Sequence, residues 1–157
     1  MEQAGIPEQL RLDHQLCFPL YASARMITSL YTPVLRPLGI TYTQYLVFLV
    51  LLERDGIRVG DLCCRLYLDN GTLTPVLKKM EAAGYLKRER CPEDERAVRV
   101  FLTDKGHGMV RQLEAVPARV GSCLRLSPED AGALYGLLYR LLEQNGCRDA
   151  GSGTSGK

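Results

Sequence analysis

Six cysteines carry the most reactive side chains in this sequence. They stand at positions 17, 63, 64, 91, 123 and 147, and the histidines are His14 and His107. No two cysteines are spaced C-x-x-C and nowhere do four ligands cluster, so we expect neither a metal ion nor a cofactor. A permanent disulfide framework is disfavoured without a secretion signal. The cysteines are then buried thiols, or include one or two reactive ones, and their spacing alone does not decide.

Charge is distributed unevenly along the chain. The 157 residues carry 20 basic and 18 acidic side chains, a net charge of +2, which argues against a protein that coats nucleic acid over its whole surface. Residues 54–111 hold 12 of the basic and 9 of the acidic residues, and thus the whole basic surplus. A local basic surface favours one face directed at a polyanion, although a solvated charged face would give the same counts.

Length and hydropathy predict one domain without a membrane span. At roughly 150 residues per domain, the chain forms a single domain over residues 1–150. The longest apolar run, residues 45–52, is far shorter than the roughly 20 residues of a membrane helix. The first five residues have neither a basic region nor an apolar core, so we expect no signal peptide and a cytoplasmic location without a membrane partner. Residues 151–157 are rich in glycine and serine and should be disordered.

A long helix is predicted over residues 8–38. Residues recur at every seventh position on one side of it, a pattern typical of packing against another helix: Leu10, Cys17, Ala24, Tyr31 and Leu38. Pro19 should kink this helix near Cys17.

Three shorter helices are predicted next, over residues 44–54, 59–68 and 70–83. Thr41 or Thr43 caps the first, and Gly84 ends the third in the left-handed conformation. Pro75 fits the third helix only near its first turn. The second and third helices, joined by a tight turn, form a helix-turn-helix unit.

Two strands follow, over residues 85–90 and 97–102, with a polar turn at 91–96. A helix-turn-helix followed by a charged hairpin is a winged helix, so the fold class is mainly α with a small β-hairpin wing, and residues 44–102 form the DNA-binding part. We expect Asn70, Thr72 and Thr74 to meet phosphates or base edges of double-stranded DNA. Basic side chains should add backbone and groove contacts, with Arg96 at the wing tip entering the minor groove: Lys78, Lys79, Arg88 and Arg96.

The last third is predicted to be helical. Thr103 caps a helix over residues 104–124 that Pro117 and Gly121 bend, and Ser127 caps a final helix with a leucine stripe. The long helices at 8–38 and 104–145 expose more apolar surface than the wing domain can cover, which predicts that they are dimerisation helices of a homodimer. A two-fold dimer presents its recognition helices roughly 34 Å apart.

Four segments resemble a known family: LCF at 16–18, TYTQYL at 41–46, LYLDNGTLTP at 66–75 and PEDER at 92–96. They are similar to the MarR-family repressors that sense organic hydroperoxides, the OhrR group, and the likeness runs from about residue 12 to 126. The Asp-Glu-Arg wing is shared by MarR proteins generally, whereas Leu-Cys-Phe is more specific to thiol sensors. Asn70 departs from the group, which has Ser at the start of the recognition helix, and this affects operator preference.

The resemblance implies a dimeric repressor whose Cys17 is oxidised by an organic hydroperoxide, after which the operator is released. In this group two tyrosines, here Tyr31 and Tyr42, hydrogen-bond the reactive thiolate. A second, resolving cysteine on the penultimate long helix matches Cys123, which places the chain with the two-cysteine type.

Helix geometry adds a condition on this site. Cys17 and Tyr31 are 14 residues apart, which is about 21 Å along one straight helix at ~1.5 Å per residue. If they touch, Tyr31 comes from the partner chain. Otherwise Cys17 is a small core residue and the tyrosines are interface packing.

Oxidation to a sulfenic acid would be followed by condensation with a second thiol. Cys123 is the first candidate and Cys147 the second. Cys63, Cys64 and Cys91 are expected to be bystanders.

Two other functions fit parts of the sequence. The first is a thiol peroxidase that uses Cys17 and Cys123, against which the basic wing argues. The second is a MarR-type repressor released by a small phenolic ligand in the dimer crevice, with the cysteines incidental.

Overall fold

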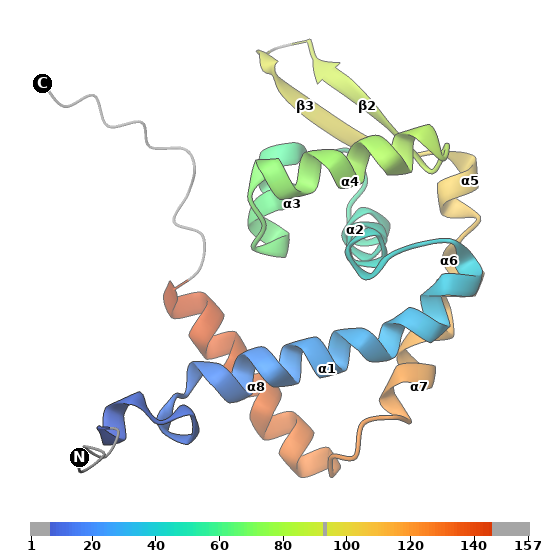
Figure 1. The fold of residues 1–157 in the computed structure, drawn as a ribbon. Coiled ribbons are helices and arrows are strands. Elements are labelled where there is room, and N and C mark those ends of the chain that lie inside the picture. Colours follow the sequence, from blue (N-terminus) through green and yellow to red (C-terminus); the bar gives the residue numbers. More distant parts are fainter. Residues whose placement is uncertain (1–6, 93, 146–157) are drawn as a thin grey trace, which may run out of the picture.

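The computed structural model describes residues 7–92 and 94–145, with backbone only at positions 95, 96 and 145. Its helices are α1 (Cys17–Leu35), α2 (Tyr42–Glu53), α3 (Val59–Leu66), α4 (Asn70–Ala82), α5 (Asp104–His107), α6 (Val110–Glu114), α7 (Val116–Gly121) and α8 (Pro128–Asn145). The strands are β1 (Ile57–Arg58), β2 (Leu86–Cys91) and β3 (Asp94–Leu102). Helices α2, α3 and α4 lie together beside the β2–β3 hairpin, and α1 lies apart from that hairpin (Figure 1).

The first helix is shorter than predicted. Two 3₁₀ turns, Glu8–Leu10 and Leu12–His14, precede α1, so the helical boundary at residue 8 is wrong. Pro19 does not break α1, because it is the third residue of the helix, where a backbone N–H has no acceptor within the helix. At the other end a 3₁₀ turn, Arg36–Leu38, leads to Gly39, which ends the segment in the left-handed conformation at a φ of 69°.

The helix-turn-helix is confirmed. Thr41 caps α2 in a capping box with Gln44, which resolves the choice between Thr41 and Thr43. Asp69 caps α4, and Pro75 stands in the second turn of that helix without ending it. The core between α2, α3 and α4 consists of side chains with at most 1% exposure, among them Phe48, Leu51, Leu62, Leu73, Leu77 and Met80.

The wing is longer than predicted and belongs to a three-stranded antiparallel sheet of order β1–β3–β2. Strand β3 begins at Asp94, so most of the predicted turn at 91–96 is strand. Charged residues in this segment are typical of a turn, but they are equally compatible with a hairpin strand whose side chains face solvent. The two-residue strand β1, which pairs Ile57 with Val100, is too short for alternation to reveal.

The predicted helix 104–124 is three short helices, α5, α6 and α7. Thr103 Oγ1 accepts the Gly106 N–H and caps α5, as predicted. Pro117 stands in the first turn of α7 and Gly121 ends it, so both predicted irregularities are real. The break after α5 was not predicted. Ser127 Oγ accepts the Asp130 N–H at the start of α8, as predicted.

Helices α1 and α8 carry uncovered apolar side chains. Phe18, Tyr21 and Met26 of α1 are exposed, as are Tyr135 and Leu137 of α8. Within the described residues no single helix could span a bilayer; the bent pair 17–38 and 42–53, with 79° between its arms, satisfies length and composition only.

Candidate functional site

Cys17 is a free, exposed thiol at the first position of α1. The first turn of a helix has backbone N–H groups without an acceptor inside the helix, and Cys17 lies in that turn. The neighbouring Leu16 and Phe18 side chains are exposed as well. In the single chain Cys17 is therefore not a buried core residue.

The two predicted tyrosines lie together and a third joins them. The rings of Tyr31 and Tyr42 are 4.6 Å apart between centroids, and Tyr45 lies 5.7 Å from Tyr31 and 6.4 Å from Tyr42. Tyr45, which the sequence analysis missed, is buried. Its signal was its spacing from Tyr42, because residues three apart share a helix face. We call these three residues the tyrosine cluster.

The phenols of Tyr42 and Tyr45 remain protonated at neutral pH. Burial, followed by the proximity of Tyr31, raises the pKa of Tyr42 above its ordinary value of 10.0. The same two causes, with Tyr42 as a third, raise the pKa of Tyr45. A protonated phenol can donate a hydrogen bond to an anionic sulfur, which stabilises the thiolate.

One chain does not bring the predicted thiol site together. Cys17 and Tyr31 stand 14 residues apart on the unbroken helix α1, about 21 Å by helical rise. Cys123 is exposed just beyond α7, where its Sγ lies 3.5 Å from the Arg119 carbonyl oxygen. Helix α7 packs against α1, on the half remote from Cys17 in Figure 1.

The other cysteines differ in exposure. Cys63 and Cys91 are buried and Cys64 is half-buried, whereas Cys147 lies outside the described residues. Within the described chain, Cys17 and Cys123 are therefore the two cysteines with exposed side chains.

The start of α4 is built from hydrogen bonds among its polar side chains. Asp69 Oδ1 accepts the Thr72 N–H at 2.8 Å, and Asp69 Oδ2 accepts the Thr72 hydroxyl at 2.8 Å. These bonds hold the pKa of Asp69 below its ordinary value of 3.8. Asn70 Oδ1 lies 3.3 Å from Cys63 Sγ. Thr74 is half-buried on the next turn, while Lys78 and Lys79 are exposed further along α4.

Arg88 does not lie free at the base of the wing. Its Nη2 and Nε atoms donate to Glu81 Oε2 at 2.6 and 2.9 Å, and its backbone N–H donates to Glu81 Oε1 at 3.0 Å. Glu81 belongs to α4 and Arg88 to β2, so the pair fastens the wing to the recognition helix. The Arg96 side chain, predicted at the wing tip, lies outside the described side chains.

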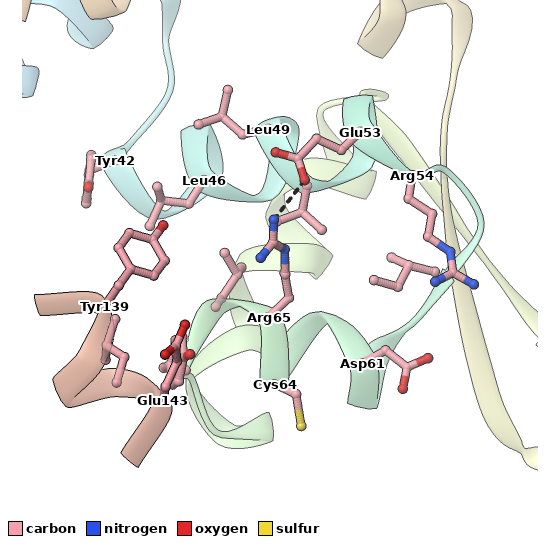
Figure 2. Close-up of a pocket in the computed structure, with 15 residues that line it drawn as sticks. Tyr42, Leu46, Leu49, Glu53, Arg54, Asp61, Cys64, Arg65, Tyr139 and Glu143 are labelled. Carbon is pink, nitrogen blue, oxygen red and sulfur yellow. Dashed lines mark hydrogen bonds and ion pairs between the residues drawn. The ribbon is translucent and has the colours of Figure 1, made fainter. Parts of the chain in front are cut away.

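A cavity of about 920 Å³ opens between α2, α3 and α8. Tyr42 lines it and thus belongs both to the cavity and to the tyrosine cluster. Figure 2 shows Tyr139 of α8 directed toward Leu46, and the Arg65 guanidinium of α3 bonded to Glu53 of α2, an Nη2–Oε2 distance of 3.0 Å.

Comparison with known proteins agrees with this architecture. The sequence profile of the MarR family matches residues 40–98. The organic hydroperoxide resistance transcriptional regulator of Bacillus subtilis (strain 168) is 43% identical over 136 residues, which cover 87% of this chain and 92% of that protein.

Two solved forms of AbfR, a Staphylococcus epidermidis protein, have the same fold. Reduced AbfR bound to DNA superposes with a TM-score of 0.72 and 35% identity, covering 87% of this chain and 95% of that one. Disulfide-formed AbfR superposes with a TM-score of 0.60 and 39% identity, covering 86% of this chain and 95% of that one. On the winged helix, the family profile and the extent of these matches, the chain belongs to the MarR family of transcriptional regulators.

Proposed function

We propose that this protein is a redox-sensing repressor that binds operator DNA as a reduced homodimer and releases it when an organic hydroperoxide oxidises Cys17. The observation that carries the proposal is the exposed Cys17 thiol at the first position of α1, in a chain that also holds the tyrosine cluster. The similarity to the hydroperoxide resistance regulator supports it. Such a protein would act in the cytoplasm, where the chromosome is.

The homodimer is supported by the exposed apolar surfaces of α1 and α8. Burial of side chains such as Tyr21, Met26 and Leu137 in an interface would stabilise a dimer by roughly 25 cal/mol per Å² of apolar surface removed from water. Residues 8–38 and 104–145 are accordingly assigned to dimerisation and 44–102 to DNA binding. In such a dimer the partner's tyrosine cluster supplies the phenols that Cys17 lacks in its own chain.

The proposed chemistry balances as two steps. The Cys17 thiolate attacks an oxygen of the hydroperoxide, the O–O bond breaks, sulfur becomes a sulfenic acid and an alcohol leaves. The Cys123 thiol of the other subunit then attacks that sulfur, a disulfide forms and water leaves. A disulfide needs α-carbons within about 7 Å, so the helices must move if the two sites start further apart.

The test is an electrophoretic mobility shift on a duplex selected by the protein from a random library. Reduced protein should retard the duplex, cumene hydroperoxide should reverse the shift, and a thiol reductant should restore it. Retardation that is unaffected by the hydroperoxide would refute redox sensing while leaving DNA binding intact.

Cys123→Ser should remove the intersubunit disulfide. We expect hydroperoxide-treated wild type to run as a covalent dimer on a non-reducing gel, and Cys123→Ser as a monomer. Mass spectrometry should find Cys17 of the variant as sulfenic acid or a more oxidised form, since no resolving thiol is left. An undiminished covalent dimer in the variant would assign resolution to another cysteine.

Lys78→Ala should weaken binding to all duplexes alike. Removing one exposed lysine that pairs with a phosphate lowers the slope of log affinity against log salt concentration by about one. Lys87→Ala is the matched control, because Lys87 Nζ already pairs with Glu89 Oε1 at 2.7 Å. Equal slopes for wild type and Lys78→Ala, measured by fluorescence anisotropy, would remove Lys78 from the interface.

The cavity supports a second candidate, release by a small phenolic ligand. Its lining combines apolar side chains with the phenols of Tyr42 and Tyr139, a setting that suits a small aromatic ring. The charged side chains of the lining include both signs, Arg54 and Arg65 beside Glu53, Asp61 and Glu143. Operator release by such a ligand from Cys17→Ser would favour this candidate. A thiol peroxidase, in contrast, would consume hydroperoxide catalytically, and the Bacillus subtilis relative is a regulator.

A further inference from the structure

Cys63 braces the turn between α3 and α4 at two of its atoms. Its carbonyl oxygen accepts the Leu68 N–H at 3.0 Å, beside Tyr67, which closes α3 in the left-handed conformation at φ 53°. Its thiol donates to Asn70 Oδ1 at 3.3 Å, a partly buried contact that reaches the first residue of α4. One residue of α3 therefore holds both the turn and the side chain that opens the recognition helix.

The direction of this hydrogen bond determines what Asn70 can offer to DNA. An asparagine amide has one acceptor oxygen and two N–H donors. Recognition of adenine by asparagine uses both ends, since the oxygen accepts from N6 while the nitrogen donates to N7. In this structure the oxygen is directed into the protein toward Cys63, which leaves the N–H donors for a partner outside.

We infer that Cys63 is a positioning residue that presents Asn70 as a hydrogen-bond donor to an acceptor oxygen of the operator. This inference rests on the DNA binding proposed above. The acceptor is a phosphate oxygen or an oxygen on a base edge, which is O6 of guanine or O4 of thymine. Asn70 does not select adenine in this arrangement.

The test measures affinity by fluorescence anisotropy for the selected operator and its single-base variants. Cys63→Ala, which removes the donor, should weaken binding about three- to tenfold, the range for one hydrogen bond. Cys63→Ser, which keeps a donor, should bind as wild type does. Asn70→Ala should weaken binding equally, and adding Cys63→Ala to it should have no further effect. Cys64→Ala, one position along α3, is the matched control and should bind as wild type does.

Asn70→Asp provides a variant that does not alter Cys63. Its carboxylate can still accept from the Cys63 thiol, but it has no N–H group and its negative charge repels an acceptor oxygen of the DNA, so binding should fall further than in Asn70→Ala. A loss that is uniform across base variants identifies a phosphate acceptor, and a loss confined to one position identifies a base edge.

Three results would overturn the inference while leaving the proposed function intact. These are unchanged affinity in Cys63→Ala, additive losses in the double variant, and a preference for adenine that Asn70→Ala abolishes. Failure of the proposed function looks different, because wild type would then retard no duplex. Thermal unfolding of each variant shows whether a loss of affinity reflects loss of fold instead.

Discussion

Cys17→Ser is expected to bind operator DNA as tightly as wild type and to remain bound in cumene hydroperoxide. Serine is nearly isosteric with cysteine and sits at an exposed position of the first turn of α1, so the fold should be unaffected. A hydroxyl is not oxidised by a hydroperoxide, however, so the response should vanish completely. Mobility shifts of both proteins across a hydroperoxide titration measure this difference.

Cys64→Ser is the control for this experiment. Cys64 is half-buried on α3 and has no role in the proposed redox chemistry, so this variant should release DNA at the wild-type hydroperoxide concentration. If Cys17→Ser also releases DNA, the sensor assignment is wrong. If Cys64→Ser fails to release it, the oxidised thiol is elsewhere.

The elements of the DNA-binding part could be predicted because each carries a local signal. The Thr41 cap and the left-handed Gly84 belong to segments whose own sequence specifies their conformation. The start of the first helix was not predictable in this way. Leu10 continues the seven-residue spacing, but the backbone before Cys17 forms 3₁₀ turns, which the spacing does not distinguish from a helix.

The residues of the candidate site could be predicted from their types, but the residues that they contact in the fold were harder to predict. Tyr31 and Tyr42 lie together as expected, yet Tyr45 joins them only because α1 and α2 pack against each other. Arg88 looked like a free cation in the sequence, since its partner Glu81 belongs to another element. Which cation meets an acid of its own chain is a property of the tertiary structure.

The Glu81–Arg88 pair should therefore support DNA binding without contacting DNA. Arg88→Ala is expected to lower the free energy of unfolding by about 1–2 kcal/mol. This is the contribution of a charged hydrogen bond, reduced because about a third of each side chain is exposed to solvent, which screens the charges. DNA affinity should fall about tenfold, equivalent to ~1.4 kcal/mol, because the wing loses the ion pair that fixes its position against α4. The salt dependence should stay unchanged, since the Arg88 guanidinium pairs with Glu81 and not with a phosphate.

Glu81→Ala separates this role from a direct phosphate contact. If Arg88 bound phosphate, removing the nearby carboxylate would strengthen DNA binding. If the pair holds the wing, its removal weakens DNA binding, and the double variant binds no more weakly than either single variant.

The stabilisation that the Glu81–Arg88 pair gives to the fold should be lost in acid. Hydrogen bonds from Arg88 hold the pKa of Glu81 below its ordinary 4.5, so the pair stabilises the fold above that value and the contribution is lost as pH falls through the lower, folded-state pKa. Unfolding followed from pH 7 to pH 3 should show a smaller acid loss in Glu81→Ala than in wild type, and equal losses would contradict the assignment.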